Sequence, residues 1–212
     1  MQKPVLIIGA KNLGVNVLEI LLANDAVVYG FLEDDTALHN TEIHLIPVLG
    51  STTDEKLLKV IGSKAEVVVA IENGKEREHY TSIFEEDYKA VPVNVLHPKA
   101  SVSKFAVIHH GNIFMAGCVV SAGASLGSGN ILGANSFIDS GALLDSYCYI
   151  GANSCINQDV HIAKGAYIGT GCTVVAGVKI GRGARIGAGS VVMADVKGGQ
   201  TVFGVPAVAV NK

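Results

Sequence analysis

The residues with the clearest potential for ligand chemistry surround a glycine-containing loop near the start of the chain. Gly9 and Gly14 follow an apolar run and precede a segment with helical periodicity that ends near Ala23. A helix that begins in such a loop presents backbone N–H groups, and these groups stabilise a bound phosphate. The residues of this loop that we expect to contact a ligand are Gly9, Lys11, Asn12 and Leu13.

An acidic cluster closes the next apolar run, over residues 26–32. Glu33 and Asp34 follow that run directly. In parallel α/β sheets, an acid at this place accepts hydrogen bonds from the ribose or base of a nucleotide. The loop by itself is equally explained as a tight turn, but the loop and the acids together predict a nucleotide-sugar site. The expected sheet is too short for the second mononucleotide half that NAD requires.

The elements that position these residues alternate between short apolar runs and helical patterns. The expected strands are 4–8, 26–32, 65–71 and 91–96. The expected helices are one that follows the Gly9–Gly14 segment and ends near Ala23, and two more over 54–61 and 76–84. This alternation is typical of a parallel sheet with helices packed on it. Residues 1–97 are therefore predicted to form a truncated, Rossmann-like α/β domain.

The second half of the chain, residues 98–212, repeats every six residues. Stepping by six from Val102 to Val192 meets an aliphatic residue at every position except Phe114. The position two residues before each of these aliphatic residues is usually occupied by a small residue. The position before that small residue is usually Gly, Asn or Asp. Positions two apart on an extended segment share a face, so both point inward. Three strands per coil predict a parallel β-helix of about five coils.

Composition excludes several classes of protein. Hydrophobic residues are 49%, charged residues 17% and mean hydropathy +0.41, which is incompatible with a disordered chain. A formal net charge of −3 leaves no basic surplus for nucleic acid or an anionic membrane. No apolar run approaches the roughly 20 residues of a membrane span, and the first residues do not resemble a signal peptide. We therefore expect a cytoplasmic protein with no nucleic-acid partner and no membrane insertion.

Taken together, these elements resemble the sialic-acid O-acetyltransferase and UDP-4-amino-sugar N-acetyltransferase family, which are hexapeptide-repeat acyltransferases. The segments that carry the resemblance are Gly9–Gly14, Phe31–Asp35, Pro47–Ser51, His97–Pro98 and Val102–Val192. The resemblance implies a left-handed β-helix, a homotrimer and a first domain that holds a nucleotide-sugar. It also implies that acetyl-CoA lies in the groove between neighbouring β-helices and acetylates an amino or hydroxyl group of the sugar.

The resemblance further implies a catalytic segment, in which this chain lacks the family's histidine base. An ungapped comparison over Ile156–Ala163 puts Gln158 at the position of the base and Asp159 at the adjacent acid. Glutamine cannot accept a proton near neutral pH. His161 lies three residues further on, at a position expected to face outward, and is the candidate substitute base.

The same resemblance implies contacts with acetyl-CoA at Tyr167, Ala176 and Ala188. Tyr167 stands in place of a histidine, and Ala176 replaces a glycine whose N–H faces the thioester carbonyl. No metal is expected, because the spacing of His109 and His110 from His161 places them about three coils away. Three of the four cysteines fall on the small-residue positions, where they fill the core.

These observations leave more than one function open. The first is an acetyl-CoA-dependent sugar N- or O-acetyltransferase. The alternative is a catalytically weakened or inactive relative that binds a sugar nucleotide or acyl-CoA without transfer. A purely structural solenoid is a third hypothesis, against which the nucleotide-type loop argues.

Overall fold

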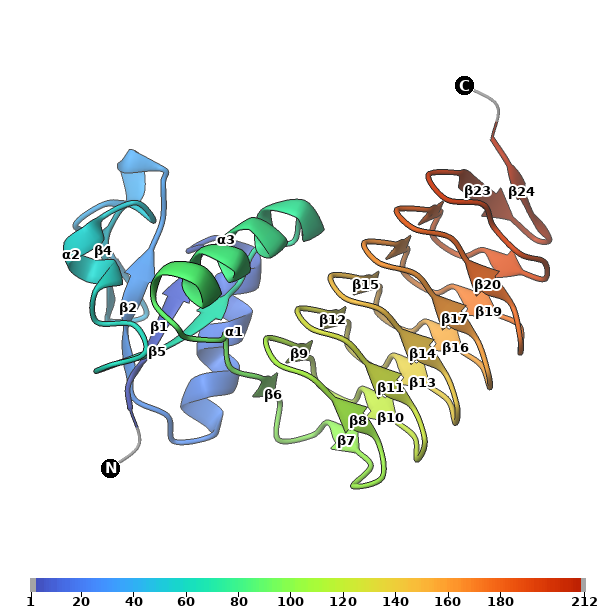
Figure 1. Ribbon diagram of the computed structural model, residues 1–212, viewed down its shortest axis with the longest axis horizontal. Coiled ribbons are helices and arrows are strands. Elements are labelled where there is room, and N and C mark those ends of the chain that lie inside the picture. Colours follow the sequence, from blue (N-terminus) through green and yellow to red (C-terminus); the bar gives the residue numbers. More distant parts are fainter. Residues whose placement is uncertain (1–2, 211–212) are drawn as a thin grey trace. The chain divides into compact units, whose positions relative to one another are not determined.

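Figure 1 shows the computed structural model of the chain, which describes residues 3–210. The chain forms two compact units, and the boundary between them lies between Pro98 and Lys99. This boundary is one residue after the predicted one. Each unit has its own hydrophobic core.

The first unit is built on a parallel sheet with the strand order β4-β2-β1-β5. Its strands are β1 (Val5–Ile8), β2 (Val28–Leu32), β4 (Ile46–Gly50) and β5 (Glu66–Val69), and the edge strand β3 (Glu42–Ile43) runs antiparallel to β4. Every residue of β1 is buried, because this central strand is covered on both faces, as is usual for a parallel sheet. The carboxyl ends of β1 and β2 therefore lie side by side, each followed by a predicted site segment.

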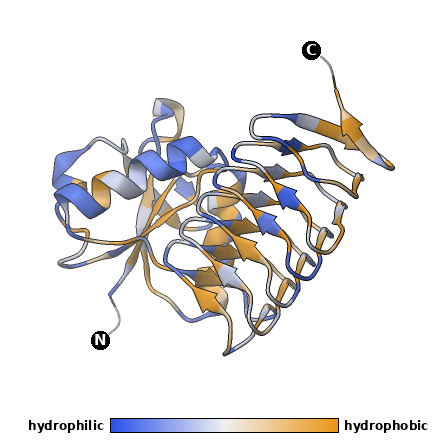
Figure 2. Ribbon diagram, turned by 45° about the vertical axis from the view of Figure 1, so that its right-hand side comes forward, coloured by the Kyte–Doolittle hydropathy of each residue, from blue (hydrophilic) through white to orange (hydrophobic). Residues whose placement is uncertain are grey.

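Three helices accompany this sheet: α1 (Asn12–Ala23), α2 (Glu55–Leu58) and α3 (Gly74–Asp87). The unit also contains a short 3-10 turn, η1 (Thr36–Leu38), and the strand β6 (Val95–Leu96). The buried residues of α1 recur at helical spacing and include Leu13, Val17 and Leu21. Helix α3 is mostly hydrophilic (Figure 2), and few of its side chains are buried. Within residues 3–210, no helix has both the length and the apolar composition of a membrane span.

The structure corrects two of the predicted elements in this unit and adds one that was not predicted. The strand expected over 91–96 is confined to β6, because Pro92 has no N–H to donate to a sheet. The helix expected over 54–61 ends at Leu58, after which Ile61 bonds back only three residues, to the carbonyl of Leu58. The hairpin of β3 and β4 was not predicted, because β3 is very short and Pro47 lies inside β4.

The second unit is a parallel β-helix in which strands 18 residues apart in the sequence pair in register (Figure 1). Its first face contains β7 (Ser101–Val102), β10 (Val119–Val120), β13 (Phe137–Ile138), β16 (Cys155–Ile156), β19 (Thr173–Val174) and β22 (Val191–Val192). Its second face contains β8 (Val107–Ile108), β11 (Ser125–Leu126), β14 (Leu143–Leu144), β17 (His161–Ile162) and β20 (Lys179–Ile180). Its third face contains β9 (Ile113–Phe114), β12 (Ile131–Leu132), β15 (Tyr149–Ile150), β18 (Tyr167–Ile168), β21 (Arg185–Ile186) and β23 (Thr201–Gly204), with β24 (Ala207–Ala209) antiparallel to β23. The repeat and its parallel strands fit the left-handed β-helix that was expected.

The interior of the β-helix contains the predicted aliphatic and small residues. Ile138, Ile156, Cys118 and Cys172, for example, are fully buried. In each two-residue strand one apolar residue points inward and the other residue points outward. The repeats therefore show both hydrophobic and hydrophilic residues in Figure 2. The turns have the expected backbone: the recurrent glycines have positive φ, and so does Asp159, at 57°. Tyr147 also has a positive φ, of 62°, which the glycine pattern did not indicate.

Two buried asparagines belong to the small-residue positions of the β-helix. The side-chain oxygen of Asn112 accepts a hydrogen bond of 2.8 Å from the backbone N–H of Asn130. The side-chain oxygen of Asn130 accepts in turn from the N–H of Cys148, also at 2.8 Å. Because both amide side chains are fully buried, this ladder satisfies polar groups that would otherwise destabilise the column. It links three successive coils.

Candidate functional site

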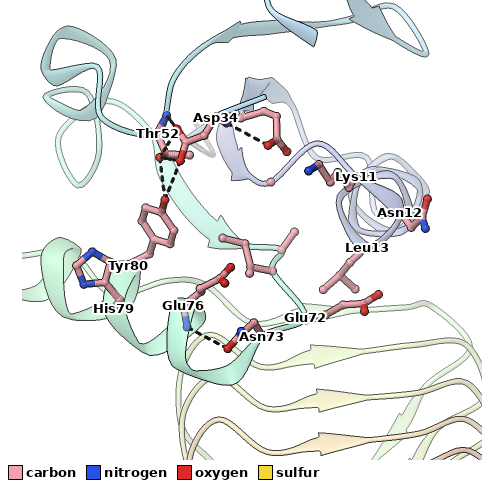
Figure 3. Close-up of a pocket in the computed structure, with 14 residues that line it drawn as sticks. Lys11, Asn12, Leu13, Asp34, Thr52, Glu72, Asn73, Glu76, His79 and Tyr80 are labelled. Atoms are coloured by element: carbon pink, nitrogen blue, oxygen red, sulfur yellow. Dashed lines mark hydrogen bonds between the residues drawn. The ribbon is translucent and has the colours of Figure 1, made fainter. Parts of the chain in front are cut away.

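A cavity of about 610 Å³ lies in the first unit, at the carboxyl ends of its parallel strands (Figure 3). All the predicted substrate-binding residues line it: Gly9, Lys11, Asn12, Leu13, Glu33 and Asp34. The rest of the lining comes from Thr52, from the end of β5 and from α3. The structure therefore gathers into one cavity the two segments that were expected to bind a nucleotide.

The glycines of the loop allow β1, α1 and β5 to approach closely. Gly9 has a φ of 98°, and a Cβ there would lie 2.7 Å from the carbonyl oxygen of Ala70. A Cβ on Gly14 would overlap the carbonyl oxygen of Gly9. No side chain larger than hydrogen fits at either position without a shift of backbone atoms.

The amino-terminal end of α1 faces this cavity without a protein cap. Its N-cap residue, Lys11, makes no side-chain capping bond, and no acidic residue occurs in the first turn. The first N–H groups of a helix have no partner within the helix, and the helix dipole favours an anion there. With the Lys11 side chain in the lining, this end of the cavity is suited to a phosphate.

Glu33 has a positioning role that the sequence did not reveal. It is only 7% exposed, and its carboxylate accepts hydrogen bonds from three backbone N–H groups: Ala10 at 2.9 Å, Asp34 at 3.0 Å and Asp35 at 3.1 Å. The bond to Ala10 ties the glycine loop to the end of β2. Glu33 thus holds the two halves of the site together, and much of its accepting capacity is used within the protein.

Asp34 is the centre of a second network, which includes residues of the segment after β4 (Figure 3). Its carboxylate accepts hydrogen bonds from the hydroxyls of Ser51 at 2.8 Å, Thr52 at 2.7 Å and Tyr80 at 3.2 Å. The backbone N–H of Thr52 donates to it as well, at 3.0 Å. Burial alone would raise the pKa of Asp34, but the hydrogen bonds outweigh burial and the pKa lies below its ordinary value.

The opposite rim of the cavity is formed by the start of α3 (Figure 3). Asn73 caps this helix, and its side-chain oxygen accepts from the N–H of Lys75 at 3.0 Å. Glu72, Glu76 and His79 are exposed residues of the lining. Burial raises the pKa of Tyr80, and the negative charges of Asp34 and Glu76 raise it further. The cavity thus has an acidic rim opposite its phosphate-favouring end.

Charge differs sharply between the two halves of the sequence. Residues 1–98 contain 15 acidic and 8 basic side chains, whereas residues 99–212 contain 4 acidic and 8 basic ones. The β-helix therefore carries positive charge although the chain as a whole is negative. An anionic co-substrate is attracted to the β-helix rather than to the acidic first unit.

The predicted catalytic residues lie on the second unit. Gln158 and Asp159 are exposed in the turn between β16 and β17. His161, in β17, is half-buried, and its Nε2 lies 3.2 Å from Oδ1 of Asp145. The other carboxylate oxygen of Asp145 accepts a bond of 3.3 Å from the backbone N–H of Lys164. Asp145 was not predicted from the sequence, where its one signal is its place directly after β14, the strand paired with β17.

The residues predicted to contact acetyl-CoA lie partly in a strand of the β-helix and partly in its turns. Tyr167 is half-buried on the third face, where its ring stacks on that of Tyr149. Ala176 and Ala188 are exposed in turns. Tyr149 was not predicted, although it stands one coil before Tyr167 in the repeat.

Metal and thiol chemistry find no support in the described part of the chain. No group of three His, Cys, Asp or Glu side chains suited to a metal occurs within residues 3–210. Cys118, Cys148 and Cys172 are buried, and burial raises the pKa of Cys118 to about 12. Such a thiol stays protonated, so it is not a nucleophile near neutral pH.

Comparison with known proteins agrees with this arrangement. The family model described as "Bacterial transferase hexapeptide (six repeats)" matches residues 159–194. The acetyltransferase domain of PglB from Neisseria gonorrhoeae FA1090 is 30% identical, with a TM-score of 0.87, and the match covers 99% of this chain and 100% of that one. PerB from Caulobacter crescentus, solved in complex with CoA and GDP-perosamine, is 28% identical, with a TM-score of 0.90 and coverage of 98% and 97%. A search of curated proteins found no match.

The identity to the PglB domain extends over the full length of both chains. The chain therefore belongs to the hexapeptide-repeat sugar acetyltransferases, the family that the order of its sequence motifs indicated.

Proposed function

We propose that this protein transfers an acetyl group from acetyl-CoA to an amino group of a nucleotide-linked sugar. The observation that carries the proposal is the full-length likeness to sugar N-acetyltransferases. The cavity of the first unit supports it independently, because the six residues expected to bind a nucleotide-sugar all line that cavity. PerB, which is similar over the whole chain, was solved with such a compound, GDP-perosamine.

The chemistry of the cavity suits a nucleoside diphosphate sugar. The uncapped start of α1 and the Lys11 side chain provide the donors and positive charge that phosphates need. The exposed carboxylate of Glu76 offers acceptors for the N–H and O–H groups of a base and a ribose. The tight Glu33 network keeps the loop in place before the ligand arrives, which reduces the entropic cost of binding.

The transfer step needs a base and an activated acyl group. The sugar amine attacks the thioester carbonyl carbon, a C–N bond forms, the C–S bond breaks, and the CoA sulfur leaves while the amine loses a proton. Gln158 cannot take that proton, so we assign the role of base to His161. Asp145 accepts the Nε2 hydrogen of His161, which fixes the tautomer whose Nδ1 is free to accept a proton. Asp159 is proposed to lie near the acceptor amine.

A homotrimer is also part of the proposal. The outward residues on the first face of the β-helix are uncharged from end to end: Ser101, Val119, Phe137, Cys155, Thr173 and Val191. An uncharged row of this kind suits burial against a second copy. The cytoplasmic location and the absence of a nucleic-acid partner stay predictions from composition.

The proposal is tested by offering the protein acetyl-CoA and a panel of GDP-, UDP- and dTDP-linked amino sugars while the release of CoA thiol is measured. We expect release with at least one amino sugar and none with its hydroxyl analogue. The variant His161→Gln should lower kcat by on the order of 100-fold. The control His44→Gln, in the turn between β3 and β4 and outside the cavity lining, should leave kcat unchanged. Binding of the nucleotide sugars and CoA without release would instead support the non-transferring relative.

A further inference from the structure

The largest fully buried side chain among the described residues is a charged one, Arg77 of α3. Its Nη1 group donates hydrogen bonds to the backbone carbonyls of Ile71, at 2.6 Å, and Glu72, at 2.9 Å. These two residues belong to the segment between β5 and α3 and line the cavity, whereas Arg77 does not. Because a buried cation is costly unless its N–H groups are bonded, we expect Arg77 to hold this segment in one conformation.

Helix α3 presents different faces to the interior of the unit and to the cavity. Its buried residues, Arg77, Thr81 and Phe84, recur at helical spacing. Glu76 and Tyr80, which are also four residues apart, line the cavity. Arg77 therefore lies on the buried side of the helix, and the carbonyls that it binds are turned toward that side.

The bonds to Arg77 determine which way two peptide groups face. In a trans peptide the C=O and the N–H lie on opposite edges of one plane, and the carbonyls of Ile71 and Glu72 both point to Arg77. The N–H groups that share their peptide planes belong to Glu72 and Asn73 and therefore point away from Arg77. Two successive N–H groups on one side of the chain form a concave donor site. Within residues 3–210, neither N–H donates to a protein acceptor.

The first turn of α3 adds an acceptor to these two donors. Glu76 is exposed, and its carboxylate extends from α3 into the cavity (Figure 3). Its backbone N–H donates to the side-chain oxygen of Asn73 at 3.4 Å, which places Glu76 next to the segment that Arg77 holds. The rim of the cavity thus combines two backbone donors with one carboxylate acceptor.

We infer that this rim selects the base of the nucleotide in the proposed reaction, on which the inference rests, and that Arg77 is its positioning residue. The N–H groups of Glu72 and Asn73 donate to a ring carbonyl oxygen, and the carboxylate of Glu76 accepts the adjacent ring N–H. A carbonyl next to a ring N–H is a lactam, which uracil, thymine and guanine contain. Cytosine and adenine present an amino group next to an unprotonated ring nitrogen, which mismatches both contacts.

The charge of the rim favours a base over a phosphate at this position. Glu72 and Glu76 are both exposed acids of the lining. Their carboxylates repel a phosphate, whereas a neutral carbonyl oxygen meets no such repulsion. The uncapped start of α1, across the cavity, is suited to the phosphates. The nucleotide is therefore oriented with its phosphates at α1 and its base at the start of α3.

The selection of the base is tested on the unmodified protein by calorimetric titration with two matched pairs of ligands. UDP and CDP differ only in the exchange of the lactam for its amino counterpart, and so do IDP and ADP. We expect the lactam member to bind about 10-fold more tightly in at least one pair and more weakly in neither. Equal affinities within both pairs would overturn the inference, because the N–H groups would then serve the phosphates or no part of the ligand.

Variants at Arg77 separate its positioning role from a role in folding. Arg77→Met keeps much of the length of the side chain but removes both carbonyl bonds, and it should reduce the preference for the lactam member to about 2-fold or less. Arg77→Lys, which keeps a donor, should retain more of the preference. A structural role alone would lower the melting temperature and leave the ratio of the two dissociation constants unchanged. That result would overturn the role of Arg77.

A variant at Glu76 tests the same contact from an exposed position, where folding is not at risk. Glu76→Ala should lower the preference for the lactam member about 3-fold or more without changing the melting temperature. The matched control is Glu86→Ala, which removes an exposed acid of the same helix outside the cavity lining, and it should leave the preference unchanged. If Arg77→Met does not fold, an unchanged preference in both Glu76→Ala and Arg77→Lys would overturn the inference.

Base selection and acetyl transfer can fail separately. Acetyl transfer with equal KM for UDP- and CDP-linked amino sugars, and with equal KM for the IDP- and ADP-linked pair, would keep the function and remove the base selection. The predicted order of affinities, with no transfer to any acceptor, would keep the base selection and remove the function.

Discussion

The imidazole of His161 lies 3.2 Å from the carboxylate of Asp145, and both side chains are 40% exposed. Exposed ion pairs contribute little to stability, so we expect this contact to orient the imidazole rather than to stabilise the fold. The charged groups around the imidazole are Asp145, Lys164, which bonds the same carboxylate through its N–H, and Lys179, the register neighbour on β20.

Asp145→Asn should therefore reduce kcat by about 10-fold or more without changing the KM of either substrate or the melting temperature. An asparagine that presents its amide N–H to Nε2 favours the tautomer in which Nδ1 carries the proton. Steady-state kinetics over a range of pH check this, and Asp145→Glu should recover part of the rate. A full rate in Asp145→Asn would remove Asp145 from the mechanism.

Gly14→Ala should destabilise the first unit and abolish nucleotide-sugar binding. The added Cβ overlaps the carbonyl oxygen of Gly9, so the loop must move away from α1, at a cost of about 1–3 kcal/mol. Calorimetric titration with a nucleotide sugar and thermal unfolding are the measurements. Asn16→Ala changes an exposed position of the same helix and should preserve both binding and stability. Normal binding by Gly14→Ala would show that the loop does not hold the ligand.

Asp34→Asn should lower stability in a pH-dependent way. The pKa of Asp34 in the folded protein lies below its ordinary value of 3.8, so the carboxylate stabilises the fold fully above about pH 4 and this contribution is lost as the pH falls through the folded pKa. Because the side chain is exposed, we expect an effect on the order of 1 kcal/mol, or a melting temperature lower by about 2–4 °C at pH 7.

The difference between wild type and Asp34→Asn should shrink in thermal melts below pH 4. Glu19→Gln, an exposed acid on the outer side of α1, serves as the control for loss of a charge alone. An equal difference between wild type and Asp34→Asn at pH 7 and pH 3 would argue against the hydrogen-bonded carboxylate as its source.

The cysteines should be slow to react with thiol reagents in the folded protein. Burial raises the pKa of Cys118 to about 12, and burial together with the negative charge of Asp139 raises that of Cys155. At pH 8 a disulfide reagent such as dithionitrobenzoate should therefore label the native protein only slowly, and at Cys155 first, because that thiol is partly exposed. All four should react after unfolding. Rapid labelling of Cys118 in the native protein would contradict the packed interior.

Much of the β-helix was predictable because one physical rule repeats through it. An inward aliphatic residue every six positions and a positive-φ turn before it determine the strands, and Ile138 and Ile156 lie where that rule puts them. The residues of the cavity could also be predicted from the sequence. Gly9 and Glu33 follow adjacent parallel strands, and such strand ends meet at one edge of a sheet.

Contacts between side chains of neighbouring coils were harder to predict from the sequence. Asp145 and His161 are 16 residues apart, and whether two outward side chains meet depends on rotamers that the repeat does not specify. Thr52 and Tyr80 were missed for a similar reason, because their hydroxyls meet Asp34 only after β4 and α3 have packed. The six-residue period constrains what points inward and leaves the outer surface free to vary.

Transfer of acetyl to a sugar amine is tested most directly by mass spectrometry of a nucleotide-linked amino sugar after incubation with the protein and acetyl-CoA. We expect an N-acetylated product in equal amount to the CoA thiol released, and a strongly reduced yield with His161→Gln. Complete recovery of the unmodified amino sugar across the panel of nucleotides, by a folded protein that binds both substrates, would contradict this expectation.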